Sequence, residues 1–295
     1  MPSLGVGVSP IWRIFTQSLA IFRQHWTKFL LLISIFLVIA IILGINANIG
    51  TELASRQVSL KQDFGDGFQA EVDITLFLFT EFLQNFFNHL TEHLFWFLGL
   101  LTIFSLSLLW LIRNLKSAPT PQLIKVKQAF YFGSAQIIPF TLLALLLILE
   151  FLPVLIVGQV ATQLRDNGVL QDVWEIWGTL LVLGVITWFC LYWILGGLFS
   201  LIIVSLPSTM PWQAWQTSFY LTHRRKKDLV RHGLFIVLVL LVGLWLVSLP
   251  IIWLLPKYIV YVFSFSSLTA IALGHIYWFL LYRDLISIQQ KGGGN

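Results

Sequence analysis

The sequence predicts an all-α membrane protein with six transmembrane helices in three pseudo-repeats, each led by a cytoplasmic amphipathic helix. Three observations favour this fold class. Hydrophobic residues make up 58% of the chain and charged residues 11%, whereas soluble domains are about half apolar and a quarter charged. The apolar residues form runs that are long enough to cross a bilayer. A pattern that begins with proline is also repeated along the chain.

The clearest copy of this pattern runs from Pro211 to Leu255. It consists of an aromatic helical stripe, a basic run from His223 to Lys227, and an apolar run. Two further copies begin at Pro10 and Pro121. The three copies align at Gln17-Ser18-Leu19, Gln128-Ala129-Phe130 and Thr217-Ser218-Phe219. We therefore expect a single membrane domain over residues 1-295, with repeat units at about 10-112, 121-206 and 211-282.

Six apolar runs predict the membrane spans, since a bilayer requires roughly 17–25 apolar residues. The runs are Phe29 to Ile45, Leu94 to Ile112, Ile137 to Thr162, Trp174 to Leu206, Leu234 to Leu255 and Tyr258 to Tyr282. The fourth is longer than one crossing needs, which indicates strong tilt or an interfacial start. After the first run, Asn46 to Asp73 is the longest polar stretch, and we expect Gly65 and Gly67 to form a turn at its centre.

The distribution of charge predicts the orientation in the membrane. Fourteen of the eighteen Lys and Arg residues lie on the side that holds the N-terminus and the loops after the second and fourth spans. The opposite side has ten of the thirteen acids and the remaining four basic residues, which are Arg56, Lys61, Arg165 and Lys257. The positive-inside rule makes the basic side cytoplasmic. We expect a bacterial inner membrane or an equivalent internal membrane, with both termini in the cytoplasm.

The basic run beside the third aromatic stripe predicts an edge that binds anionic lipid. Aromatic rings set the depth in the interface while cations meet phosphates, each contributing about 1 kcal/mol near the surface. The alternative is that these cations only determine topology, and both interpretations can hold together. The predicted lipid-binding residues are Trp212, Trp215, Arg224, Arg225, Lys226, Lys227 and Arg231.

Glu150 is the one acid deep inside a predicted span. A charged side chain at that depth costs roughly 2.5–3.5 kcal/mol on insertion scales, so it is a candidate midplane site for a proton or cation. A protonated or hydrogen-bonded carboxyl group that supports the helix beside Pro153 is equally compatible with the sequence.

Two weaker candidates involve histidine. His89, Glu92 and His93 match an H-x-x-E-H zinc pattern, but the same residues also suit the polar face of an interfacial helix that begins near Phe79. His275 suggests an axial ligand to haem or chlorophyll, although the small residues spaced around it favour close helix packing instead. We expect no cofactor.

The proline-led pattern from Pro10 to Phe29, and more clearly from Pro211 to Phe235, resembles the membrane domain found beside glycerophosphoryl diester phosphodiesterases and its stand-alone six-span bacterial relatives. The resemblance implies an integral inner-membrane protein of six helices with no settled activity. The catalytic domain is absent: His223-Arg224-Arg225 is not that enzyme's His-Arg-Gly, and no acidic partner motif follows it. Phosphodiesterase activity is therefore not implied.

These features favour a non-enzymatic membrane module that binds anionic lipid at its cytoplasmic face and scaffolds or regulates partner proteins. The sequence has no Walker A loop, nucleophile elbow or dinucleotide fingerprint. A secondary transporter or lipid-handling protein with its site at Glu150 is the alternative. A subunit of a larger pigment or respiratory complex is a third. We expect lipid, and protein partners or a second copy of the chain, to bind it, and no nucleic acid.

The predicted orientation can be tested with cysteines introduced at Ser59, Asn167, Ser117 or Ser208. A membrane-impermeant thiol reagent should label residues 59 and 167 from outside intact cells, because both lie on the acidic side. It should not label residues 117 and 208. Labelling of the second pair in intact cells would overturn the orientation.

Overall fold

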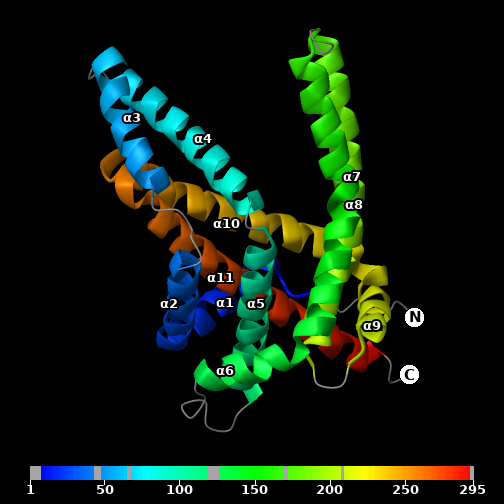
Figure 1. Ribbon diagram of the computed structural model, residues 1–295. Helices are drawn as coiled ribbons and strands as arrows, with labels where there is room; N and C mark the ends of the chain where they lie inside the picture. The colour runs from blue at the N-terminus through cyan, green and yellow to red at the C-terminus, as the bar shows by residue number, and fades with distance from the viewer. Residues whose placement is uncertain are drawn as a thin grey trace. The chain divides into compact units, whose positions relative to one another are not determined.

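The computed structural model describes residues 8–42, 48–64, 68–92, 94–117, 126–168, 172–206 and 209–292. Over these residues the chain is almost entirely helical and has no strand, which confirms the all-α class. Figure 1 shows the helices. They are α1 (Ile11–Gln24), α2 (Trp26–Ile42), α3 (Asn48–Phe64), α4 (Phe68–Glu92), α5 (Leu94–Ser117), α6 (Val126–Gly133), α7 (Ile137–Asp166), α8 (Val173–Val204), α9 (Pro211–Thr222), α10 (Lys226–Leu254) and α11 (Ile259–Gly292), with short 3-10 turns η2 (Ser134–Gln136), η3 (His223–Arg225) and η4 (Pro256–Tyr258).

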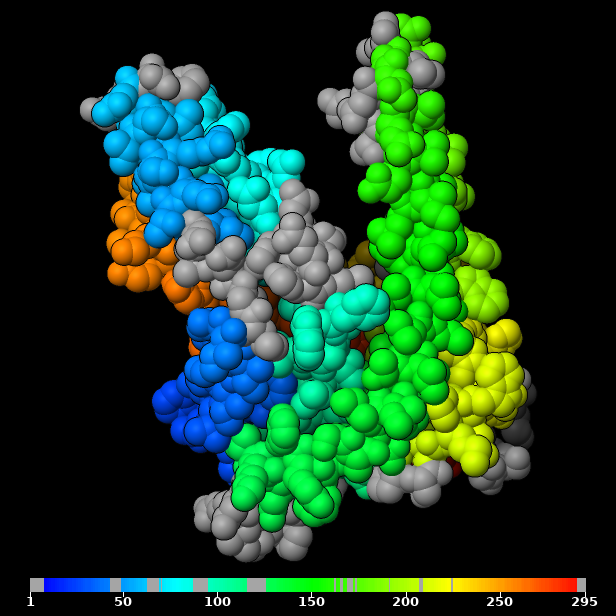
Figure 2. Space-filling model, viewed as in Figure 1, coloured from blue at the N-terminus to red at the C-terminus, as the bar shows by residue number. Residues whose placement is uncertain are grey.

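Five segments of the described chain are long and apolar enough to cross a membrane: α5, α6 with α7, α8, α10, and η4 with α11. They coincide with five of the six predicted runs. The described part of the remaining run, Phe29 to Ile45, falls on α2, and its last three residues lie outside the described chain. α2 has 17 residues and makes a sixth candidate together with α1, which is bent from it by 80°. Large apolar side chains are exposed along these helices, for example Leu149 on α7, which is 63% exposed. Figure 2 shows α7 in green along one flank of the molecule. Such surfaces indicate a multi-pass membrane protein.

The chain forms two compact units. One consists of Met1–Ile11, Ala135–Phe235 and Trp278–Asn295, and we call it the α7–α8 unit. The other consists of Trp12–Ser134 and Ile236–Tyr277, and we call it the α3–α4 unit. The boundaries fall within α1, η2, α10 and α11 and differ from those of the predicted repeat units, which remain a prediction.

In the α7–α8 unit, α7 and α8 lie side by side as a helical hairpin. Gly168, just past the end of α7, has φ 69°, a left-handed conformation that glycine adopts without steric penalty. At the start of α8 the Asp172 N–H donates a hydrogen bond to the Glu175 carboxylate at 3.3 Å, which satisfies one helix-terminal donor. Pro211 occupies the first position of α9, where its missing N–H does no harm. α9 then packs against α7 and α8.

In the α3–α4 unit, the described part of the predicted polar stretch is helical, which the sequence analysis missed. α3 and α4 pack against each other, and α3 also contacts η4. Apolar side chains on these elements and on the adjoining ends of α10 and α11 form one buried cluster: Ile49, Leu53, Ile74, Leu78, Phe82, Ile252, Ile259 and Val260. Two ion pairs, Arg56 with Glu81 at 3.0 Å and Lys61 with Glu71 at 3.5 Å, join the polar faces. On α3 only two apolar residues, one turn apart, are buried in this cluster, and Leu60 packs against it while partly exposed. So few apolar positions in a polar stretch do not form a helical pattern that the sequence alone reveals.

The third copy of the proline-led pattern, which we expected to continue as one amphipathic helix from Pro211 to about Asp228, is divided among three elements. α9 ends at Thr222, η3 covers His223–Arg225, and Lys226 begins α10. The basic run is therefore divided between a 3-10 turn and the first turn of the long apolar helix. Its last two lysines thereby share a helix with apolar residues that the sequence assigned to a separate span.

The contact between α3 and η4 generates a stability prediction. A Cβ atom at Gly50 would overlap the backbone carbonyl oxygen of Lys257, so Gly50→Ala must displace one element. Overpacking of this kind costs about 1–3 kcal/mol, and it opposes the gain in helix propensity of up to ~1 kcal/mol. We expect a lower free energy of unfolding, measured by denaturation in detergent micelles and followed by circular dichroism.

Gly243→Ala on α10 is the matched control, since nothing lies within 4 Å of the added Cβ there. This variant should be neutral or slightly stabilising. If Gly50→Ala and Gly243→Ala change the unfolding free energy equally, the contact between α3 and η4 does not limit stability.

Candidate functional site

The structure places one cation of the basic run inside a ring of aromatic side chains in the α7–α8 unit. The ammonium nitrogen of Lys226 lies 4.1 Å from the ring centroid of Tyr192, 5.3 Å from that of Trp193 and 5.5 Å from that of Phe219. A cation over aromatic faces gains about 0.5–1 kcal/mol where exposed and about 2 kcal/mol where desolvated. Lys226 is only partly exposed, so these rings replace a good part of its water.

Two glycines of α8 set the position of the rings. A Cβ atom at Gly196 would come within 3.2 Å of the Phe219 ring, and one at Gly197 within 3.0 Å of the Trp215 ring. The Ser218 hydroxyl donates a hydrogen bond to the Gly196 carbonyl oxygen. Because Gly196 and Gly197 have no side chains, α9 can approach α8 closely at these positions. The Ser218 hydroxyl fixes the register of α9 against α8.

Glu150 on α7 lies near the same lysine. One of its carboxylate oxygens, Oε2, is buried and has no hydrogen-bond partner in the described chain. The Lys226 ammonium is close enough for an attractive charge interaction with Glu150, although the two groups do not form a direct ion pair. A positive charge nearby offsets part of the cost of holding a carboxylate in an apolar helix. The sequence analysis identified Glu150 and Lys226 separately and missed that they belong together.

The other predicted lipid-binding residues have different surroundings. Lys227, Arg231 and Trp212 are exposed, with Trp212 at 65%. Trp215 packs beside Phe219, with 4.8 Å between the ring centroids. The Nη1 atom of Arg225 is buried without a hydrogen-bond partner among the described residues, and the side chain of Arg224 lies outside the described part. Lipid binding by this set stays a prediction.

Among the described residues, the structure adds no further metal-binding side chain to the histidine candidates. His93 and the side chains of His89 and Glu92 lie outside the described residues, so the zinc pattern stays untested there. Elsewhere in the described chain, no group of three or more potential metal-binding side chains occurs. His275 Nδ1 lies 2.8 Å from the Ile271 carbonyl oxygen. Because a carbonyl only accepts, this nitrogen carries the hydrogen and donates.

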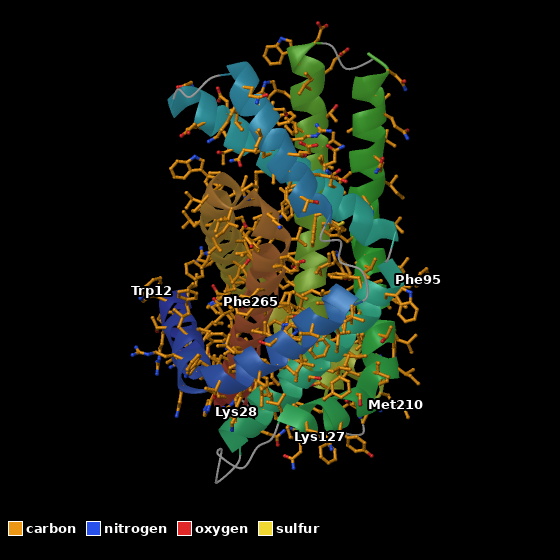
Figure 3. The ribbon with its side chains drawn as sticks, turned by 60° about the vertical axis from the view of Figure 1, so that its left-hand side comes forward. Trp12, Lys28, Phe95, Lys127, Met210 and Phe265 are labelled. Atoms are coloured by element: carbon orange, nitrogen blue, oxygen red, sulfur yellow. The ribbon has the colours of Figure 1, made fainter. Side chains whose placement is uncertain are left out.

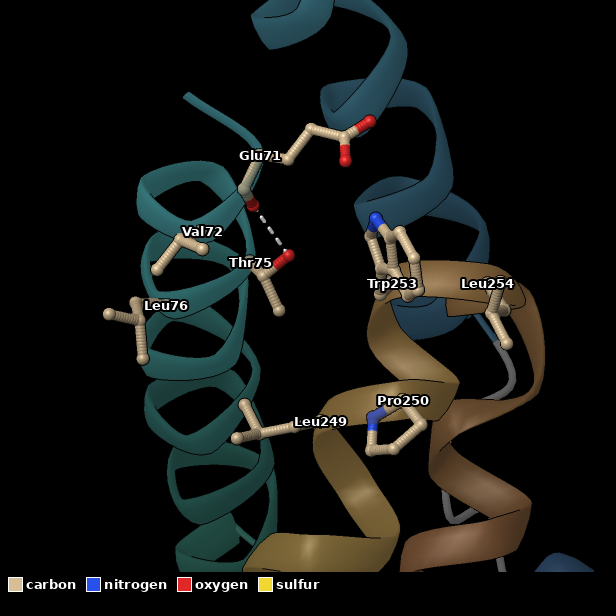
Figure 4. A pocket seen from close by; sticks show the side chains of 8 residues that line it. All are labelled: Glu71, Val72, Thr75, Leu76, Leu249, Pro250, Trp253 and Leu254. Carbon is tan, nitrogen blue, oxygen red and sulfur yellow. Dashed lines mark hydrogen bonds between the residues drawn. The ribbon is translucent and has the colours of Figure 1, made fainter. Parts of the chain in front are cut away.

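Two cavities among the described residues of the α3–α4 unit have largely apolar linings. The first, of about 380 Å³, lies between α4 and α10 beside Pro250 (Figure 4). Two of its polar side chains are already engaged, since the Thr75 hydroxyl donates to the Glu71 carbonyl oxygen at 2.7 Å and the Glu71 carboxylate pairs with Lys61. The second, of about 270 Å³, lies among α2, α4, α5 and α11. Neither is lined by Glu150.

Comparisons with protein families, with curated proteins and with solved structures found no match for this chain.

The proximity of Glu150 and Lys226 predicts that the two side chains are energetically coupled. Lys226→Gln removes both the cation over the rings and the counter-charge of Glu150, so we expect a loss of about 1–3 kcal/mol of unfolding free energy. The control Lys227→Gln, at an exposed neighbour, should change stability by less than about 0.5 kcal/mol.

A double-mutant cycle with Glu150→Gln isolates the coupling. Once Gln replaces Glu150, the further change Lys226→Gln should cost less than it does in the parent, because there is no longer a carboxylate to neutralise. Thermal unfolding of all four proteins in the same detergent provides the measurement. Strict additivity would show that the two groups do not interact.

Proposed function

We propose that this chain is a non-enzymatic membrane protein that binds anionic lipid at its cytoplasmic face and scaffolds or regulates partner proteins there. The observation that carries the proposal is the exposure of Lys227 and Arg231 at the start of α10. These residues are four apart and share one helix face, directly before a long apolar segment. Cations at the boundary of an apolar helix lie at the depth of lipid phosphates.

Exposed aromatic residues on the short helices support an interfacial position. On α9, Trp212 and Tyr220 are 65% and 75% exposed. On α1, Trp12 is 65% exposed and points outward (Figure 3), and on α6 Tyr131 is 73% exposed. Tryptophan and tyrosine are enriched at membrane interfaces because one part of the ring system is apolar and another is polar.

The three pseudo-repeats are part of the proposal. Each expected copy has a short helix, a break and a long helix: α1 and α2, α6 and α7, α9 and α10. The aligned small residues Ser18, Ala129 and Ser218 are all buried. This recurrence supports the internal repeat and agrees with the resemblance to the membrane domain of the phosphodiesterase relatives, which we also propose as the family.

The proposed topology has both termini in the cytoplasm of a bacterial inner membrane or an equivalent internal membrane. Near the N-terminus, the Ser9 N–H and hydroxyl donate to the two carboxylate oxygens of Asp284 at 2.8 and 2.9 Å. This contact supports placing both termini on one side, as six spans require. The basic residues then favour the cytoplasmic side.

We do not extend the proposal to transport. Lys226 provides a counter-charge for Glu150, which supports a structural role for the acid.

Neutralising the two exposed cations tests the proposal. Lys227→Gln with Arg231→Gln should remove about 2 kcal/mol of attraction to an anionic surface, less the part that salt screens. The protein should then retain less anionic lipid when it is reconstituted in discs of mixed anionic and zwitterionic lipid at low salt. Mass spectrometry of the retained lipid measures this preference, and added salt should weaken it in the parent protein.

The pair Lys61→Gln and Lys257→Gln is the control, because it removes the same charge from the side predicted to face outward. It should leave the preference for anionic lipid unchanged. Equal lipid preference in the parent and the Lys227/Arg231 variant at low salt would mean that the basic run is only a topology signal.

A further inference from the structure

The second cavity of the α3–α4 unit has the composition of a site for a hydrocarbon chain. It measures about 270 Å³ and is lined by five phenylalanines, together with aliphatic residues and two serines from α11. A cavity of about 150 Å³ with apolar walls stays dry and admits benzene. This one is larger and contains no charged side chain in its lining, so a hydrocarbon suits it better than water does.

The cavity follows more than two turns of α11 and has aromatic contacts in its walls. Its lining on α11 extends from Phe263 to Ile271, or about 12 Å at 1.5 Å per residue. Phe36 and Phe104 pack together with 4.9 Å between their ring centroids, and Phe86 contacts Phe263 with 5.2 Å between theirs. A single extended chain fits such a space, whereas both chains of one lipid do not.

One polar group in the lining has no partner. Ser264 is 8% exposed, and its hydroxyl oxygen makes no hydrogen bond within the described chain. Its neighbours behave differently: the Ser266 hydroxyl donates to the Val262 carbonyl oxygen at 2.8 Å, and Thr269 donates to that of Phe265 at 2.9 Å. A buried hydroxyl without a partner in an apolar setting is costly. The Ser264 hydroxyl is covered in the structure, and rotation about χ1 into another staggered position would turn it toward a molecule in the cavity.

The position of Ser264 suggests which acceptor it meets. It lies five residues after Ile259, the first residue of α11, or about 7.5 Å along the helix. Leu268 and Ile271, further along, line the apolar remainder. In a bilayer the polar interfacial region lies outside the hydrocarbon, so the ester group of a lipid occupies the outer end of such a site and its chain points inward.

We propose that this cavity binds one acyl chain of a membrane phospholipid, and that the Ser264 hydroxyl donates a hydrogen bond to the ester carbonyl of that chain. A free fatty acid fits less well because its carboxylate would meet no cation among the lining residues. This site is independent of the proposed anionic-lipid surface: it lies in the other unit, uses no basic residue and does not select the head group.

Photo-crosslinking tests the site. The full-length protein is reconstituted with phosphatidylcholine that has a diazirine in one acyl chain, irradiated, and mapped by mass spectrometry. Labelling should concentrate on the α11 segment from Phe263 to Ile271. The α7 segment around Leu149 serves as the reference, since its exposed side chains contact bulk lipid and should take up less label per residue than α11.

Three variants decide the assignment. Ala40→Phe places a ring in the cavity and should reduce α11 labelling to the level of the α7 reference. Ser264→Ala should reduce it roughly three- to tenfold, the effect of one net hydrogen bond. Ser266→Ala is the matched control, because that hydroxyl already bonds to its own helix, and it should label as the parent does.

The results that would overturn the proposal are specific. If Ser264→Ala labels α11 as strongly as the parent does, the assigned hydrogen bond is ruled out. Selective labelling by a diazirine fatty acid in place of the phospholipid rules it out as well. If Ala40→Phe fails to fold, the comparison of Ser264→Ala with Ser266→Ala decides alone. Neither outcome depends on whether Lys227 and Arg231 bind anionic lipid.

Discussion

The long apolar helices require hydrocarbon as their solvent, and the other features of the chain follow from this requirement. On α7 and α8 the exposed side chains are leucine, isoleucine, valine and aromatic residues over many turns. A helix satisfies its own backbone hydrogen bonds, so only its side chains must match the lipid. Polar groups on such helices need a partner, a route to the interface or a ligand.

Charged residues close to an apolar helix meet this constraint in two ways. Lys227 and Arg231 remain exposed at the start of α10, where long stems can reach a polar interface. Lys226, directly before Lys227 in the sequence, turns toward the rings of Tyr192, Trp193 and Phe219. One basic run therefore contains cations suited to lipid phosphates and a cation held by the protein. The break at η3 contributes to this division, because α9 ends at Thr222, before the basic run, and α10 begins at Lys226, within it.

Much of the fold could be predicted from the sequence, because long hydrophobic runs predict helices that can cross a membrane. α7 begins at Ile137 and α8 at Val173, within one residue of the predicted starts at Ile137 and Trp174. The α3 helix could not be predicted, because its polar surface hides the two apolar residues that bury it against α4 and η4. Its stability comes from tertiary contacts rather than from its own pattern.

The candidate site was only partly predictable for a related reason. Glu150 was identifiable as a solitary acid in an apolar run, and Lys226 as part of a basic run, but no spacing rule connects positions so far apart. Gly196-Gly197, preceded by Tyr192-Trp193, was the one local signal, since paired glycines in a helix mark a close approach. The Ser264 cavity left no signal, because a serine in a membrane helix commonly bonds to its own backbone.

The contrast between Ser264 and Ser266 shows how unpaired polar atoms can be interpreted in an apolar environment. Both serines occupy one helix, two residues apart, and therefore differ in the neighbours they face. Ser266 is satisfied by its own helix, so its hydroxyl requires nothing further. Ser264 belongs to the lining of a space rich in phenylalanine, where an unpaired hydroxyl costs about 1–3 kcal/mol and an acceptor in that space would recover part of this cost. Glu150 Oε2 is also unpaired but has Lys226 nearby to reduce its cost. A missing hydrogen-bond partner therefore indicates a nearby charge of the protein at Glu150 and an acceptor on a bound molecule at Ser264.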